Sequence, residues 1–184
     1  MALQSMEQVL HELTVALGAI NPTQVAQLEE MLMHTEEIFL CGLGRSGLCC
    51  NGFAMRLMHL GMRSSIVGDV LTKPIQANDL LVITSASGTG KALEARAQKA
   101  KALGAKIALI TSNICTPLAG LADLLIEIKA PTKCDCGTER ASMLPMGSLF
   151  EETAFLLFDL ITADLMAAMQ ITNADMVSRH ANLE

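Results

Sequence analysis

Residues 38–47 read Ile-Phe-Leu-Cys-Gly-Leu-Gly-Arg-Ser-Gly, a short apolar run that ends in a glycine-rich turn. The apolar run is typical of a buried strand, and the pattern from Leu48 to Leu60 predicts a helix after it. The glycines match G-x-G-x-x-G, a turn whose backbone closely approaches a bound phosphate. We therefore expect Gly44, Arg45 and Ser46 at a ligand. An alternative is that the glycines only permit tight strand-to-helix packing and that Arg45 is solvated.

The same alternation of short apolar runs and helical segments continues beyond this turn. Parallel strands joined by right-handed helical crossovers carry helices on both faces of the sheet, so the pattern predicts an α/β fold. Strands are expected at Ile38–Cys41, Ser65–Val67, Leu80–Thr84, Ile107–Thr111 and Leu124–Ile128, with helices at Leu48–Leu60, Lys91–Leu103 and Pro117–Ala122.

Helices flank this core on both sides. Apolar residues at three- and four-residue spacings predict a helix over Leu3–Leu17, and Asn21-Pro22 is typical of the start of a second one. A long helix is expected from Ser148 to Met169, followed by a short one at Asn173–Ser178 and a polar tail. We therefore divide one domain, residues 1–184, into N-terminal helices (1–36), an α/β core (37–147) and C-terminal helices with the tail (148–184).

A second candidate phosphate loop follows the third expected strand. Residues 85–90 read Ser-Ala-Ser-Gly-Thr-Gly, and a helix begins at Lys91. Backbone amides at a helix start, together with three hydroxyls, can hold a phosphate monoester without a large basic surface. The candidate binding residues are Ser85, Ala86, Ser87, Gly88, Thr89 and Gly90. A Walker A loop is excluded because its glycine and hydroxyl positions do not match, whereas a simple helix cap remains an alternative.

The placement of the two loops distinguishes between two kinds of ligand. In a sheet of order 2-1-3-4-5 the strand order reverses between strands one and three, and ligands bind at that point. Both loops follow those two strands, which favours a single sugar phosphate. A dinucleotide remains an alternative because Asp69 stands 22 residues after Gly47, where an acid would bind a ribose hydroxyl.

Composition limits the remaining classes of function. The chain has 184 residues, of which 51% are hydrophobic and 17% charged, and this surplus of apolar residues predicts subunit interfaces. A net charge of −6 argues against a nucleic-acid partner. No uncharged apolar stretch reaches the roughly 18 residues of a membrane helix and no secretory signal is visible, so we expect a cytoplasmic protein without a membrane partner. The six cysteines are expected to be free thiols.

At these residues the chain resembles the SIS (sugar isomerase) domain family, and within it the 6-phospho-3-hexuloisomerases. The narrower resemblance is carried by the turn at 42–47 and by three further segments: Phe53–Gly61, the run Pro-Met-Gly-Ser-Leu-Phe-Glu at 145–151, and the terminal Arg-His-Ala-Asn-Leu-Glu at 179–184. It implies interconversion of 3-hexulose 6-phosphate and fructose 6-phosphate, in the ribulose monophosphate pathway, by a homotetramer that needs no cofactor and no metal.

Two catalytic residues follow from this resemblance. Glu151 would be the base that moves a proton between adjacent carbons through a 2,3-enediol, and His180 would move protons between the two oxygens. Alternatively, Glu151 only complements the dipole of its helix, and the tail that carries His180 is frayed. Another phosphosugar isomerase and a non-catalytic sugar-phosphate sensor remain alternative functions.

The chain also departs from the usual SIS pattern. The family's second loop is usually Ser-Gly-Ser-Gly-Glu-Thr, whereas Ala86, Thr89 and Gly90 stand here at three of those positions, which bears on substrate choice more than on phosphate binding. Cys134 and Cys136 are atypical for the family as well. They have no second Cys or His pair at matched spacing, so they do not predict a structural zinc site.

Overall fold

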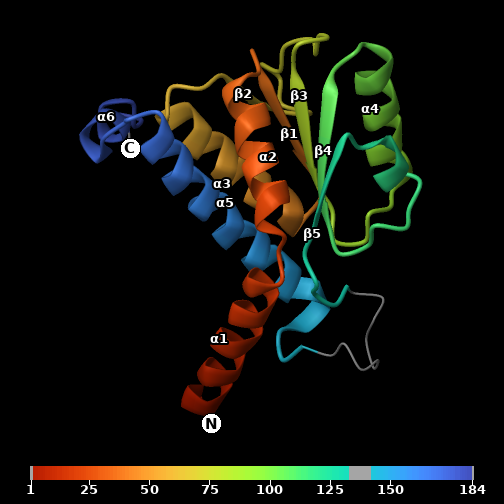
Figure 1. The fold of residues 1–184 in the computed structure, drawn as a ribbon, viewed down its shortest axis with the longest axis vertical. Helices are drawn as coiled ribbons and strands as arrows, with labels where there is room; N and C mark the ends of the chain where they lie inside the picture. Colours follow the sequence, from red (N-terminus) through yellow and green to blue (C-terminus); the bar gives the residue numbers. More distant parts are fainter. Residues whose placement is uncertain (1, 133–141, 184) are drawn as a thin grey trace.

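A five-stranded parallel sheet forms the centre of the protein (Figure 1). The structure is a computed structural model that describes residues 2–132 and 142–183. Its strand order is β2-β1-β3-β4-β5, and every neighbouring pair is parallel, so the predicted fold class and order are confirmed. The strands are β1 (Ile38–Gly42), β2 (Ser64–Ile66), β3 (Leu80–Thr84), β4 (Lys106–Thr111) and β5 (Leu124–Glu127).

Helices cover both faces of the sheet, as predicted. One face carries α2 (Pro22–Met33), α3 (Arg45–His59) and the long α5 (Ser148–Ala168), while α4 (Lys91–Ala102) and the short η1 (Ala119–Leu121) lie on the other (Figure 1). Helix α1 (Ala2–Gly18) packs on α5 and extends beyond the sheet. The remaining elements are η2 (Pro145–Gly147) and α6 (Asn173–Ser178). The 3-10 turn η1 is shorter than the helix expected over Pro117–Ala122.

The larger of two apolar cores lies between the sheet and the helices α2, α3 and α5. Leu28, Leu32, Phe53 and Leu57 are fully buried there, and the ring of Phe53 stacks on that of Phe158 with centroids 4.3 Å apart. Burying one such side chain stabilises the fold by about 1.5–3 kcal/mol relative to leaving it in water. This core fixes the beginnings of α3 and α5 beside the carboxyl ends of the strands.

The turn from β1 into α3 requires a glycine at its first position. A Cβ at Gly42 would lie 2.7 Å from the backbone of Ser46, so the backbone of α3 approaches the strand end as closely as the G-x-G-x-x-G pattern predicts. Both roles that the sequence left open for the glycines, tight packing and phosphate approach, are compatible with this contact.

Beyond α6 the tail lies against the carboxyl end of α3. Arg179 donates from Nη1 to the His59 carbonyl oxygen at 2.9 Å, and the ring of His180 stacks on the buried ring of His59 with centroids 5.1 Å apart. His59 is thus a packed residue. Among the described residues, none of the helices is long and apolar enough to cross a bilayer.

Candidate active site

A cavity of about 200 Å³ lies at the carboxyl ends of β1 and β3, where the strand order reverses. Both predicted loops border it. Ser46 comes from the first loop, Ser85, Ala86, Ser87 and Thr89 come from the second, and Glu151 comes from the first turn of α5. The structure therefore brings together most of the binding residues that the sequence predicted, together with the expected base.

Three helices begin around this cavity, and each begins at a glycine. The N-cap residues of α3, α4 and α5 are Gly44, Gly90 and Gly147, and none of the three helices has a side-chain hydrogen bond at its cap. The first-turn N–H groups of a helix without such a cap are available to a ligand, and the helix dipole favours an anion there. An acidic protein can thus present a local site for a dianion.

The second loop is held rigidly at the end of the sheet. The N–H of Gly88 donates to the Ser85 carbonyl oxygen at 3.1 Å, and the N–H of Ser112 donates to the Ala86 carbonyl oxygen at 3.1 Å. Gly88 has a φ of +62°, and a Cβ there would lie 2.6 Å from the Asn113 carbonyl oxygen. Only glycine fits this position without displacing the segment that follows β4, so the loop shape is fixed before any ligand binds.

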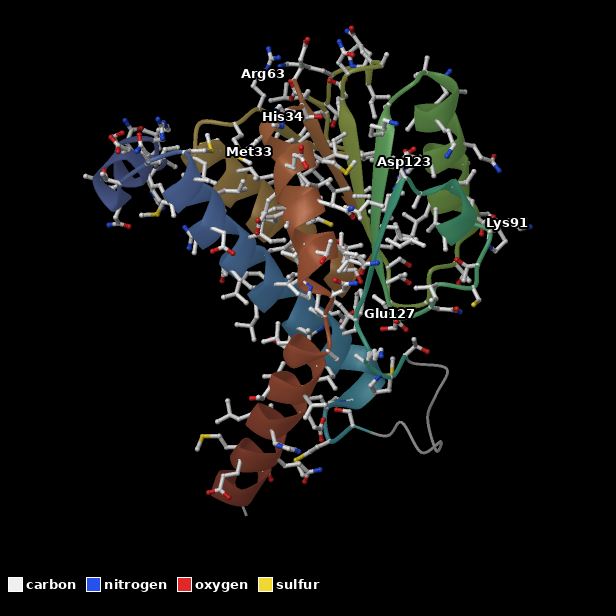
Figure 2. All side chains as sticks on the ribbon, in the orientation of Figure 1. Met33, His34, Arg63, Lys91, Asp123 and Glu127 are labelled. Carbon is white, nitrogen blue, oxygen red and sulfur yellow. The ribbon has the colours of Figure 1, made fainter. Side chains whose placement is uncertain are left out.

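The hydroxyl groups of this loop form a small cluster beside its amides. Thr89 Oγ1 donates to Ser87 Oγ at 3.0 Å, so the two side chains lie together at the cavity wall. Lys91, the cation that follows the loop, points away from the body of the protein (Figure 2) and does not border the cavity. Hydroxyls and backbone amides are therefore the donors that this loop offers to an anion.

The expected base, Glu151, is held by an arginine from the first loop. Arg45 Nε lies 2.6 Å from Glu151 Oε2, and Arg45 Nη2 lies 2.8 Å from Glu152 Oε1. These bonds raise the pKa of Arg45, first through the hydrogen bond to Glu151. Only 15% of the Glu151 side chain is exposed, compared with 56% of that of Arg45. Arg45 thus contacts the expected base, and its binding to substrate stays a prediction.

A cysteine lies behind the same carboxylate. Cys49 Sγ donates to the Glu151 carbonyl oxygen at 3.4 Å. Burial, and then the charges of Glu151 and Glu152, raise the pKa of the Cys49 thiol to about 11. The thiol is therefore neutral at physiological pH and is a poor nucleophile, which leaves Glu151 as the group beside the cavity suited to proton transfer.

The structure does not bring His180 to this cavity within one chain. His180 stacks on His59, the last residue of α3, whereas Arg45 and Ser46 begin that helix. A helix of 15 residues spans about 20 Å, so the two expected catalytic side chains are separated by roughly the length of α3. Figure 1 shows the same separation, with the C-terminus at the end of α5 that lies away from the strand ends.

Sequence reasoning missed several residues around the site. Leu43, Thr84, Leu93, Thr132 and Met146 also line the cavity. Thr84 ends β3 and adjoins the predicted loop, so its position was signalled, but the others depend on how the helices pack. Conversely, Asp69 does not line this cavity and lies instead in an exposed turn after β2. Cys134 and Cys136 lie outside the described residues.

Comparison with known proteins agrees with this geometry. The model of the SIS domain matches residues 31–154, about two thirds of the chain. The chain belongs to the SIS domain family. The match includes both candidate phosphate loops and Glu151, whereas His180 lies beyond it. No group of three or more His, Cys, Asp or Glu side chains that could hold a metal occurs in the part of this SIS protein that the structure describes.

Relatives of similar length resemble nearly the whole of this SIS chain. It is 38% identical to the 3-hexulose-6-phosphate isomerase of Bacillus subtilis over 96% of each chain. It is also 38% identical to the enzyme of the same name from Mycobacterium gastri, over 98% of this chain and 90% of that one. A Methanococcus jannaschii protein, whose crystal structure infers the function of a 3-hexulose-6-phosphate isomerase, is 31% identical with a TM-score of 0.86, over 98% of this chain and 99% of that one.

Proposed function

We propose that this protein is a ketose-phosphate isomerase that interconverts D-arabino-hex-3-ulose 6-phosphate and D-fructose 6-phosphate. The observation that carries the proposal is the placement of Glu151 on the wall of a cavity whose other wall is the Ser/Thr loop at residues 85–90. The loop would hold the phosphate and the carboxylate would act on the carbon chain. The relatives named 3-hexulose-6-phosphate isomerase support the choice of substrate, and formaldehyde assimilation or detoxification is the corresponding pathway.

The reaction requires one proton to leave a carbon and one to return to the neighbouring carbon. Glu151 takes the proton from C2 of the 3-ketose, and the electrons of that C–H bond form the C2=C3 bond of a 2,3-enediol while His180 gives a proton to O3. His180 then takes the proton of O2, which restores a carbonyl at C2, and the electrons of the C2=C3 bond take the proton back from Glu151 at C3. One carboxylate can serve both carbons because its two oxygens reach adjacent positions on the same face.

Arg45 fits this mechanism as a positioning residue. Its ion pair with Glu151 holds that carboxylate in one position at the cavity wall, and its second bond to Glu152 fixes the guanidinium in one orientation. The uncapped amides of α3, α4 and α5 would stabilise the negative charge of an enediolate. No cofactor takes part in these steps.

His180 enters this mechanism from another copy of the chain. Within one chain it lies about the length of α3 from Glu151, so a catalytic role between O2 and O3 requires a subunit interface. Exposed apolar side chains on α3 and α5 favour such an interface; they include Leu48, Met55, Met58, Phe155 and Leu160. We propose a homotetramer that works in the cytoplasm.

Hydrogen exchange distinguishes this reaction from its alternatives. Incubation with fructose 6-phosphate in D2O, followed by NMR, is expected to show deuterium entering at C3 through the 2,3-enediol. Deuterium at C1 instead would indicate a 1,2-isomerase of the same family. Binding without any exchange would indicate a sugar-phosphate sensor. A thermal shift with NAD, and none with fructose 6-phosphate, would indicate a dinucleotide protein and contradict the proposal.

Two matched variants test the base. Glu151→Gln and Glu152→Gln each remove one carboxylate that accepts from Arg45, so both weaken the same arginine clamp. Loss of a general base typically costs about 10²–10⁴-fold in rate, and we expect that loss only for Glu151→Gln. If Glu151→Gln kept both turnover and exchange at C3, Glu151 would not be the base.

A further inference from the structure

A second cavity, of about 330 Å³, lies on the face of the sheet that α4 covers. It is bounded by α4, by β1 and β3, and by the connection from β2 to β3. No residue lines both this cavity and the candidate active site. Residues 67–79 contain no helix, so this part of the sheet is covered by the irregular connection from β2 to β3, with Val67 and Ile75 packed on the core, and the cavity lies between that connection and α4.

The wall of this cavity is apolar. Phe39 and Leu81 come from the sheet, while Val67 and Ile75 come from the connection between β2 and β3. Phe39 and Leu81 are each only 2% exposed, so they belong to the core and present a fixed surface to the cavity. A cavity of this size and lining suits the hydrocarbon part of a small molecule and excludes a polyhydroxylated sugar.

Arg96 carries a charge into this apolar surrounding without an acidic partner. Its half-buried side chain donates from Nη1 to Cys41 Sγ at 3.3 Å, and Arg96 makes no ion pair with any described residue. Burial raises the pKa of the Cys41 thiol, against the lowering effect of Arg96, so the sulfur is a neutral acceptor. A guanidinium has five N–H donors, and a partly buried charge is costly unless an anion pairs with it.

The other charged groups at the cavity increase the positive potential. Lys99 lies three residues after Arg96 and likewise makes no ion pair with a described residue. Lys73 lies at the border as well, but it pairs with Glu37 at 3.0 Å, which cancels its charge. Two cations therefore remain unpaired at the edge of an apolar cavity, in a protein whose net charge is −6.

We infer that this cavity binds a small amphipathic anion, a monocarboxylate with an aliphatic or aromatic body. The carboxylate accepts from the free nitrogens of Arg96 and from Lys99, and the apolar body lies against Phe39, Ile75 and Leu81. Arginine suits this role because its planar group can hold both oxygens of one carboxylate. This site is separate from the isomerase site, so the inference does not depend on the proposed function.

The probe is octanoate, added to the full chain and followed by thermal shift and calorimetry. Two control compounds separate the requirements: octanol keeps the apolar body without the charge, and acetate keeps the charge without the body. We expect saturable binding of octanoate only. Binding of octanol as tight as that of octanoate, or no binding of octanoate, would overturn the inference.

Three variants locate the binding on the protein. Arg96→Gln is expected to weaken the binding of octanoate by about tenfold or more, because it removes a charged donor. Lys101→Gln, on the same helix but outside the cavity, removes an equal charge and should leave binding unchanged. Ala95→Glu places a carboxylate at the cavity edge four residues before Lys99, so it should block binding while stabilising α4.

Stability and turnover complete the test. Because Arg96 has no acidic partner among the described residues, Arg96→Gln should unfold at a temperature no lower than that of the parent. Octanoate should raise the unfolding temperature of the parent and leave that of Arg96→Gln unchanged. Both Arg96→Gln and Ala95→Glu should retain isomerase turnover. Octanoate binding that survives in Arg96→Gln and in Ala95→Glu would place the ligand elsewhere and refute this site.

Discussion

The position of His180 leads to a prediction about which subunit completes the active site. His180 stacks on His59, the last residue of α3. His59 lies 14 residues after Arg45 along this helix, and Arg45 contacts Glu151. At 1.5 Å per residue this is about 20 Å, several times the reach of a proton transfer. If both side chains act in one reaction, they must come from different copies of the chain.

Mixing two inactive variants measures this directly. Glu151→Gln lacks the base, and His180→Ala lacks the proton-transfer group. When subunits reassort in a 1:1 mixture, about one half of the sites have an intact Glu151 and about one half of those receive an intact His180, so about one quarter of parental activity should return. The assay is conversion of fructose 6-phosphate after co-refolding the variants, with each variant refolded alone as the control.

The result that would refute this reasoning is equally clear. If both residues came from the same chain, every chain in the mixture would lack one of them, and no activity above that of the separate variants would return. His180→Ala that is fully active by itself would instead remove His180 from the reaction. A recovered fraction near one quarter supports both the shared site and the oligomer that it requires.

Two further substitutions test the loop and a pH-dependent contact. Gly88→Ala should abolish the thermal shift with fructose 6-phosphate, because its φ is +62° and the new Cβ would lie 2.6 Å from the Asn113 carbonyl oxygen; binding as tight as in the parent would contradict the fixed loop. Burial and the nearby Asp164 raise the pKa of Glu29. The contribution of protonated Glu29 to the stability of the fold is therefore lost as pH rises through that pKa. Glu29→Gln should therefore raise the unfolding midpoint at pH 7 and lose this advantage in acid, and a gain that is the same at all pH values would contradict it.

Much of the fold could be predicted because it follows from local patterns. The runs Ile38–Cys41 and Leu80–Ile83 are apolar throughout, as strands buried on both faces of a parallel sheet must be, and all expected strand ends agree with the structure within one residue. The strand order was predicted because the two candidate phosphate loops follow strands one and three, and these strands are neighbours in the order 2-1-3-4-5. Two helices differ from the expected ones. Helix α3 begins at Arg45, three residues before Leu48, and the segment 117–122, which includes Pro117 and Gly120, forms only the three-residue 3-10 turn Ala119–Leu121.

The site could be predicted less completely, because its side-chain contacts cross between elements far apart in the sequence. Glu151 was named through a motif, but its ion pair with Arg45 joins residues 106 positions apart, and no spacing in the sequence encodes it. The same applies to Arg96 and Cys41, which lie 55 positions apart and meet only because α4 packs over β3 and β4, so that the Arg96 side chain reaches β1. Such pairs depend on helix packing, whereas glycine turns depend on local backbone geometry.

The two cavities bind anions, as we propose, by different physical means in one acidic chain. At the isomerase site the donors are uncapped amides at Gly44, Gly90 and Gly147 together with hydroxyls, and Arg45 is already paired with carboxylates. Such donors are fixed and carry no net charge, so they can hold a phosphate without a cation from the loop. At the α4 cavity the donors are the unpaired charges of Arg96 and Lys99. Added salt should therefore weaken the binding of octanoate more than the binding of fructose 6-phosphate, and an equal effect on the two affinities would contradict this distinction.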